Sequence, residues 1–123
     1  MKTDAIEFDT MKNLRQIVST LQSGKWAIEK LDDPFDNVGG SAPDIAVLIS
    51  GRASVVDAFK HFGAGKSEWA VQVIVTDLGN TRHVEMIALG ESGFAAARAG
   101  MNNQYFNIRH SKDHRNQIAQ MLA

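Results

Sequence analysis

Two strand-like runs on either side of a short turn constrain this chain more than any other feature of its sequence. Residues 69–76 are rich in Val and Ile, and in residues 82–89 one face would carry Val84, Met86 and Ala88 and the other the remaining side chains from His83 to Leu89, patterns that are typical of β-strands. Only residues 77–81 separate the two runs, and residues 77–80 among them form the predicted turn. A connection this short joins antiparallel neighbours, because a parallel crossover needs about a dozen residues or more. The sequence therefore predicts an antiparallel hairpin.

The spacing of apolar residues predicts further elements on both sides of this hairpin. Apolar residues at helical spacing indicate helices, whereas short apolar runs between turn residues indicate strands. Asp9 or Thr10 is suited to cap the first helix, Gly24 to end it, and Ser111 to cap the last helix. The expected helices cover residues 10–23, 52–62, 91–99 and 111–122, and the expected strands cover 25–31, 44–50 and, as a short edge strand, 105–108.

The order of these elements predicts a single α+β domain over residues 1–123. We expect a mixed or antiparallel sheet of four to five strands with helices packed mainly on one face. A length of 123 residues suits one hydrophobic core. Residues 1–8 lie in a polar and acidic stretch, and we expect them to form a flexible or loosely attached N-terminus.

Composition excludes several classes of function. The chain has no cysteine, so disulfides, thiolate metal sites and cysteine nucleophiles are excluded. No apolar run reaches the roughly 18 residues that a membrane span needs. The segment 1–10 also lacks the apolar stretch of a secretory signal. We therefore expect a cytoplasmic protein without a membrane partner.

Charge is distributed unevenly along the chain, although the formal net charge is only −1. Residues 1–91 carry nine Lys and Arg against thirteen Asp and Glu, whereas residues 92–123 carry four against one. The basic C-terminal part also contains aromatic side chains, and proteins that bind single-stranded nucleic acid combine these residue types. Nucleic acid is therefore a candidate partner, and its candidate binding residues are Arg82, Tyr105, Arg109, Lys112 and Arg115.

The segment 32–43 is expected to form a long loop, since it contains two prolines, two adjacent glycines and several acids. Loops of this length are either packed by their own side chains or functional. The apolar residues in it indicate a contact surface or a flap that folds back on the sheet. The candidate protein-contact residues are Asp32, Asp33, Phe35, Asp36 and Val38.

Two histidine patterns suggest chemistry, and neither is complete. His83 and Glu85 share one face of a predicted strand, where they form either an acid–base pair or an ordinary polar stripe. His110 and His114 are four residues apart, which is the spacing of two metal ligands on a helix. A third ligand would have to come from elsewhere in the fold, so no metal site is assigned.

Two glycine-containing segments resemble phosphate sites in part. Residues 65–67 match the end of a phosphate-binding loop, but a helix precedes them and a strand follows, which is the reverse of the required order. Residues 50–54 join a buried strand to a predicted helix. Such a junction is either a site for an anion beside Arg52 or simply a capped helix.

No catalytic residue, metal ligand or cofactor is therefore assigned. The sequence favours a small non-catalytic protein-binding module, such as an adaptor, regulator or inhibitor, that contacts another protein or forms a homodimer. Two alternatives stay open. One is a nucleic-acid-binding protein that uses the basic C-terminal segment, and the other is a small enzyme that uses histidine and carboxylate chemistry.

Overall fold

A five-stranded antiparallel sheet with two helices forms the part of the chain that the structure describes, in agreement with the predicted α+β class. The computed structural model describes residues 5–32, 34, 42–52, 68–90 and 106–123. Its elements in chain order are β1 (Ala5–Thr10), α1 (Leu14–Gln22), β2 (Ala27–Lys30), β3 (Ile45–Arg52), β4 (Glu68–Asp77), β5 (Arg82–Leu89) and α4 (Ile108–Leu122).

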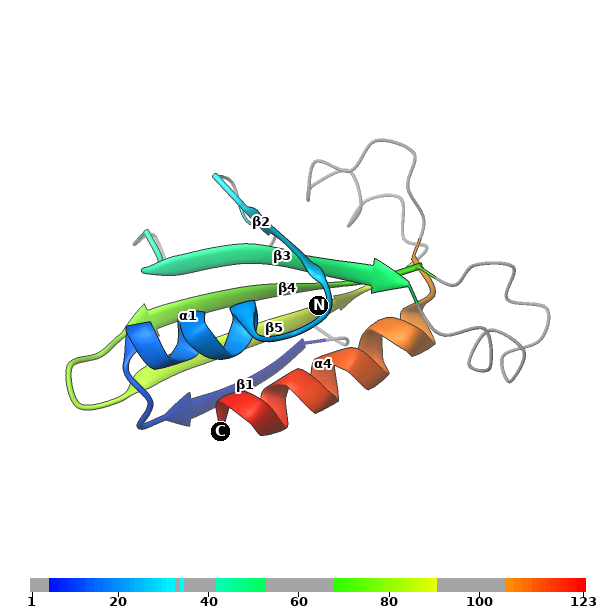
Figure 1. The fold of residues 1–123 in the computed structure, drawn as a ribbon. Helices are drawn as coiled ribbons and strands as arrows, with labels where there is room; N and C mark the ends of the chain where they lie inside the picture. Colours follow the sequence, from blue (N-terminus) through cyan, green and yellow to red (C-terminus); the bar gives the residue numbers. More distant parts are fainter. Residues whose placement is uncertain (1–4, 33, 35–41, 53–67, 91–105) are drawn as a thin grey trace.

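The strands lie in the order β1-β5-β4-β3-β2, and every neighbouring pair is antiparallel (Figure 1). The predicted hairpin is confirmed, with Thr76 opposite His83 and Asp77 opposite Arg82. Gly79 has a φ of 93° in the turn, a conformation that glycine adopts without the steric cost of a Cβ. Because β1 and β2 lie at the two ends of the strand order, they form the two edges of this sheet.

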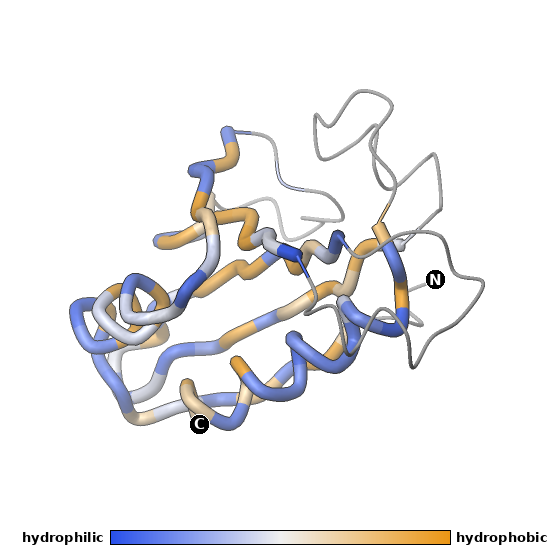
Figure 2. Tube along the Cα trace, turned by 45° about the vertical axis from the view of Figure 1, so that its right-hand side comes forward, coloured by the Kyte–Doolittle hydropathy of each residue, from blue (hydrophilic) through white to orange (hydrophobic). Residues whose placement is uncertain are grey.

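Both helices pack on one face of the sheet, as expected (Figure 1). Side chains alternate between the faces of a strand, and Trp69, Val71, Val73 and Val75 of β4 point toward the helices with at most 2% of their surface exposed. Figure 2 shows central strands that are largely hydrophobic and an α4 that is largely hydrophilic. The helix residues buried in this core are Ile17, Leu21, Ile118 and Leu122.

A second cluster of buried residues lies on the opposite face of the sheet. Leu48, Ala70, Ile87 and Leu89 alternate with the residues of the main core and contact Phe106, which precedes α4. Burial of each large apolar side chain in this cluster, such as Leu89, contributes about 1.5–3 kcal/mol. The sheet thus carries buried apolar side chains on both faces, and on this second face the polar Gln72 of β4 is fully buried among them.

The segment 5–10 forms strand β1. This corrects the expectation of a flexible or loosely attached stretch through residue 8 and a helix from residue 10. Ile6 and Phe8 point into the main core, while Glu7 and Asp9 lie on the opposite face. The apolar residues of this segment alternate with Glu7 and Asp9, and these acids made the segment too polar for a strand to be predicted. Pairing with β5 then determines the conformation of these residues more strongly than their own propensity does.

The predicted start of the first helix was wrong, because α1 begins at Leu14. Asn13 caps it: its side chain accepts a hydrogen bond from the amide of Gln16 at 2.8 Å, and the Gln16 side chain accepts one from the amide of Asn13. This reciprocal capping box satisfies two amide groups that the helix leaves unpaired. Asp9 and Thr10 lie in β1 instead.

The start of the last helix also differs from the prediction. Asn107 caps α4 by accepting from the amides of Arg109 and His110, so the helix includes Ser111 in its first turn. Phe106 and Asn107 belong to no strand, which corrects the expected edge strand at 105–108. Ser111 is buried, and its hydroxyl accepts from the amide of Ala70 in β4 at 3.1 Å.

The helices expected at 52–62 and 91–99, apart from Arg52 at the end of β3, lie outside the described residues, as does the glycine-containing segment 65–67. Within the described residues, no helix combines the length and the apolar character that crossing a membrane requires.

Candidate functional site

The edge strand β2 is the most accessible part of the sheet. All four of its residues are exposed, including the side chain of Ile28, and it pairs only with β3 among the described strands. The other edge differs, since four of the six residues of β1 are at least half-buried. β2 therefore presents a sheet edge that an additional strand can reach.

The backbone of β2 is arranged for such an addition. The amide of Leu31 donates to the carbonyl of Ala46 at 2.9 Å, and hydrogen-bonded pairs alternate with unbonded pairs along antiparallel strands. Leu31, Glu29 and Ala27 therefore direct their backbone groups toward β3. Ile28 and Lys30 direct theirs outward, which provides two donors and two acceptors on the edge.

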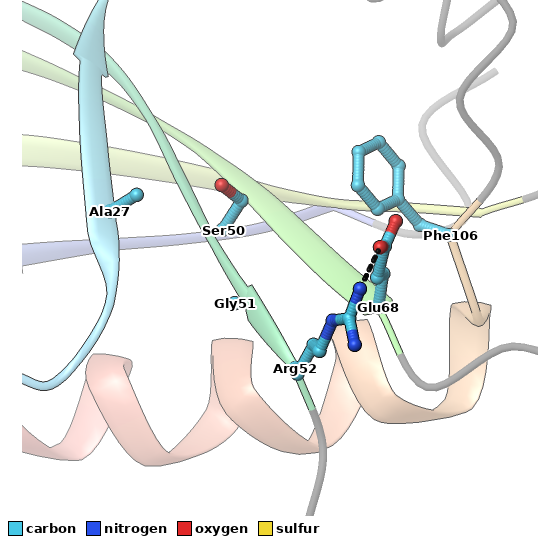
Figure 3. A pocket seen from close by; sticks show the side chains of 6 residues that line it. All are labelled: Ala27, Ser50, Gly51, Arg52, Glu68 and Phe106. Atoms are coloured by element: carbon cyan, nitrogen blue, oxygen red, sulfur yellow. Dashed lines mark hydrogen bonds and ion pairs between the residues drawn. The ribbon is translucent and has the colours of Figure 1, made fainter.

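A pocket of about 290 Å³ lies beside this edge, at the ends of β3 and β4 (Figure 3). The guanidinium of Arg52 lies 3.4 Å from Glu68, with 78% and 43% of the two side chains exposed. An ion pair this exposed contributes at most about 1 kcal/mol, so it yields readily to a competing ligand. The lining residues are Ala27, Ser50, Gly51, Arg52, Glu68 and Phe106.

His83 is paired with two acids of β1. Its Nδ1 lies 2.7 Å from Oδ1 of Asp9, and its Nε2 lies 3.7 Å from Oε1 of Glu7. The hydrogen bond to Asp9 raises the pKa of His83, against a smaller lowering by partial burial. Sequence reasoning missed this partner because Asp9 was assigned to a helix cap, although the register of β1 and β5 places it directly opposite His83.

The two histidines of α4 serve packing. His110 is 2% exposed. The ring of His114 stacks on Trp69 with centroids 3.9 Å apart and planes 7° apart, while its Nδ1 lies 2.8 Å from the carbonyl oxygen of His110. Trp26 meets Trp69 edge-on at 6.3 Å. Among the described residues, no group of three His, Asp or Glu side chains is arranged to hold a metal ion.

The candidate nucleic-acid residues are not gathered into one surface by the described part of the structure. Arg109 and Lys112 are exposed on α4, but Arg115 is 8% exposed and donates to Asn116 from two guanidinium nitrogens. Tyr105 lies outside the described residues. This leaves two exposed cations on the helix, which is few for an electrostatic footprint.

Arg82 fastens the N-terminal strand to the hairpin. Its guanidinium donates to the carbonyls of Met11, Lys12 and Gly79 at 2.7–3.2 Å and lies 3.6 Å from Asp77, with only 11% of the side chain exposed. These contacts occupy the guanidinium within the fold. The long sequence separation from Lys12 explains why no local pattern revealed this role.

Of the candidate protein-contact residues in the predicted acidic loop, the structure describes only Asp32. Asp32 is exposed directly after β2, at the accessible edge of the sheet. The other members of the set, Asp33, Phe35, Asp36 and Val38, lie outside the described residues.

Comparison with known proteins identifies no relative. No family model matches the chain, and neither a curated protein nor a solved structure matches it significantly. Any functional assignment therefore depends on the exposed edge, the pocket and the charged clusters described above.

Proposed function

We propose that this chain is a non-catalytic protein-binding module that receives a partner strand on the outer edge of β2. The supporting observation is that β2 is exposed along its whole length and directs the backbone groups of Ile28 and Lys30 outward. Strand addition of this kind gains affinity from main-chain hydrogen bonds and specificity from alternate side chains.

The side chains of β2 restrict which strand fits. Short edges with charged residues discourage pairing with arbitrary strands, and β2 carries Glu29 and Lys30 on opposite faces. Ile28, which is 39% exposed, supplies an apolar contact on the same face as Lys30. A partner strand therefore needs an apolar residue opposite Ile28 and no like charge opposite Glu29 or Lys30.

Two matched variants test the edge. Ile28→Lys places a charge in the middle of β2, and Met121→Lys makes the same change on α4 at a side chain of nearly equal exposure, 40% against 39%. The tagged chain and both variants are used for pull-downs from native lysate, with and without nuclease. We expect a stoichiometric protein that survives nuclease and is lost from Ile28→Lys but retained by Met121→Lys.

Other outcomes contradict the proposal in different ways. Capture that disappears with nuclease supports the alternative, a nucleic-acid-binding protein that uses Arg109 and Lys112. A partner retained equally by both variants places the interface away from β2. The cytoplasmic location expected from the cysteine-free sequence stays a prediction, which fractionation of cells expressing the chain checks.

A further inference from the structure

We infer that the strand that binds β2 is β2 of a second copy of this chain, paired antiparallel about a two-fold axis at Ile28. This inference depends on the proposed use of the β2 edge and names its partner. The net charge of the chain is only −1, so two copies repel each other weakly. The two-fold arrangement places identical surfaces against each other, as in most homodimers.

Backbone geometry limits the registers of such a pair. Bonded pairs must join residues whose amides and carbonyls point outward in both copies, which within β2 are Ile28 and Lys30. Three registers satisfy this condition. They place Ile28 opposite itself, Lys30 opposite itself, or Ile28 opposite Lys30 with the axis at Glu29.

Charge selects one of the three registers. Like charges directly opposite each other destabilise a strand pair. Pairing Lys30 with itself sets two ammonium groups opposite each other. An axis at Glu29 sets two carboxylates opposite each other. The axis at Ile28 avoids both conflicts. It joins two exposed isoleucines on the helix face and places Glu29 of each copy opposite Ala27 of the other.

The surroundings of β2 favour the same register. Ala27 lines the pocket that contains Arg52, so Glu29 of the second copy arrives on the side of the sheet that carries this cation. On the helix face, Lys30 of the second copy lies next to Trp26, whose indole donates to the carbonyl of Leu21 at 2.7 Å. A cation beside an aromatic ring is a favourable contact. Both sheets then form one continuous sheet with the helices of both copies on the same face.

Sedimentation of the whole chain over roughly 10 µM to 1 mM tests the dimer. An edge pairing this short belongs to the small, weak class of interfaces, so we expect a mass that rises from monomer toward dimer with concentration. Ile28→Lys should weaken association at least ~10-fold, while Met121→Lys should behave as the wild type. Circular dichroism verifies that both variants are folded.

Disulfide cross-linking tests the register, and the absence of native cysteine makes it specific. In the proposed register Ala27 and Glu29 form an unbonded pair with Cα atoms about 4.5 Å apart, within the range for a disulfide. A mixture of Ala27→Cys and Glu29→Cys should therefore oxidise to the mixed dimer, whereas each alone should cross-link poorly. Rapid cross-linking of Glu29→Cys alone indicates the axis at Glu29 and overturns the proposed register.

The failures of the two proposals are distinguishable. If the chain stays monomeric up to ~1 mM, its dissociation constant for self-association is above that concentration and the homodimer is overturned. If the pull-down then still yields a partner that only Ile28→Lys loses, strand addition at β2 stands with a different occupant. If that partner is equally retained by Ile28→Lys, both proposals are wrong.

Discussion

Replacing Asp9 with Asn should lower the pKa of His83 and remove a pH-dependent contribution to stability. The hydrogen bond between Nδ1 of His83 and Asp9, at 2.7 Å, raises the pKa of the imidazole more than partial burial lowers it. The negative charges of Asp9 and Glu7 raise it further. Asparagine keeps the shape of the aspartate without its charge, so the imidazolium loses its main stabilising contact.

The expected energy is small because the pair is exposed. The side chains of His83 and Asp9 are 38% and 56% exposed, and exposed ion pairs contribute about 0.2–1 kcal/mol. Because the pKa of His83 is higher in the folded chain, this contribution is fully present below the unfolded value of about 6.5. It is lost as the pH rises through the folded value. The free energy of unfolding should therefore differ between wild type and variant by ~0.5 kcal/mol near pH 5.5 and by almost nothing near pH 8.5.

Proton NMR of the imidazole follows the titration of His83, and urea unfolding at both pH values measures the stability. Asp32→Asn is the matched control, because Asp32 is exposed after β2 at the other edge of the sheet. The reasoning is refuted if Asp9→Asn leaves the titration of His83 unchanged. It is equally refuted by a stability difference that is as large near pH 8.5 as near pH 5.5.

Three further substitutions test the packing of α4, each by urea unfolding at neutral pH. Ser111→Ala removes the acceptor of the buried amide of Ala70 and should cost about 1–3 kcal/mol; no loss would mean that the bond is not formed. Gly90→Ala should cost about 1–3 kcal/mol, because its Cβ would lie 2.7 Å from Cβ of Ile108; a neutral effect would mean that α4 shifts freely. Ile118→Val should cost about 0.5–1.5 kcal/mol at a side chain with no exposed surface, and a gain in stability would contradict the packing described for it.

The sequence predicted the parts of the fold in which local pattern and tertiary structure agree. The β4–β5 hairpin has strong strand residues and a turn glycine, and β5 runs over the expected residues 82–89. β1 was missed because Glu7 and Asp9 make the segment polar, although Ile6 and Phe8 alternate with them. An edge strand of this kind depends on its neighbour more than on its own residues.

The candidate sites depended on contacts that no local pattern contains. His83 meets Asp9 and Arg82 meets the carbonyl of Lys12 only because β1 returns to the side of β5. Likewise, the sequence indicated a strand near Ala27–Lys30 but not its place at the exposed edge. Strand order decides which backbone groups remain available, and the sequence alone leaves strand order open.

The pairing of β1 with β5 has a consequence for the folding pathway. β2, β3, β4 and β5 are neighbours both in sequence and in the sheet, so they can assemble by successive local hairpins. β1 pairs with the strand farthest from it in sequence, and this closure carries a larger loop entropy cost. We therefore expect the meander to form early and β1 to join late. The unpaired side of β5 is exposed until then, so it is the surface on which a folding intermediate of this chain would aggregate.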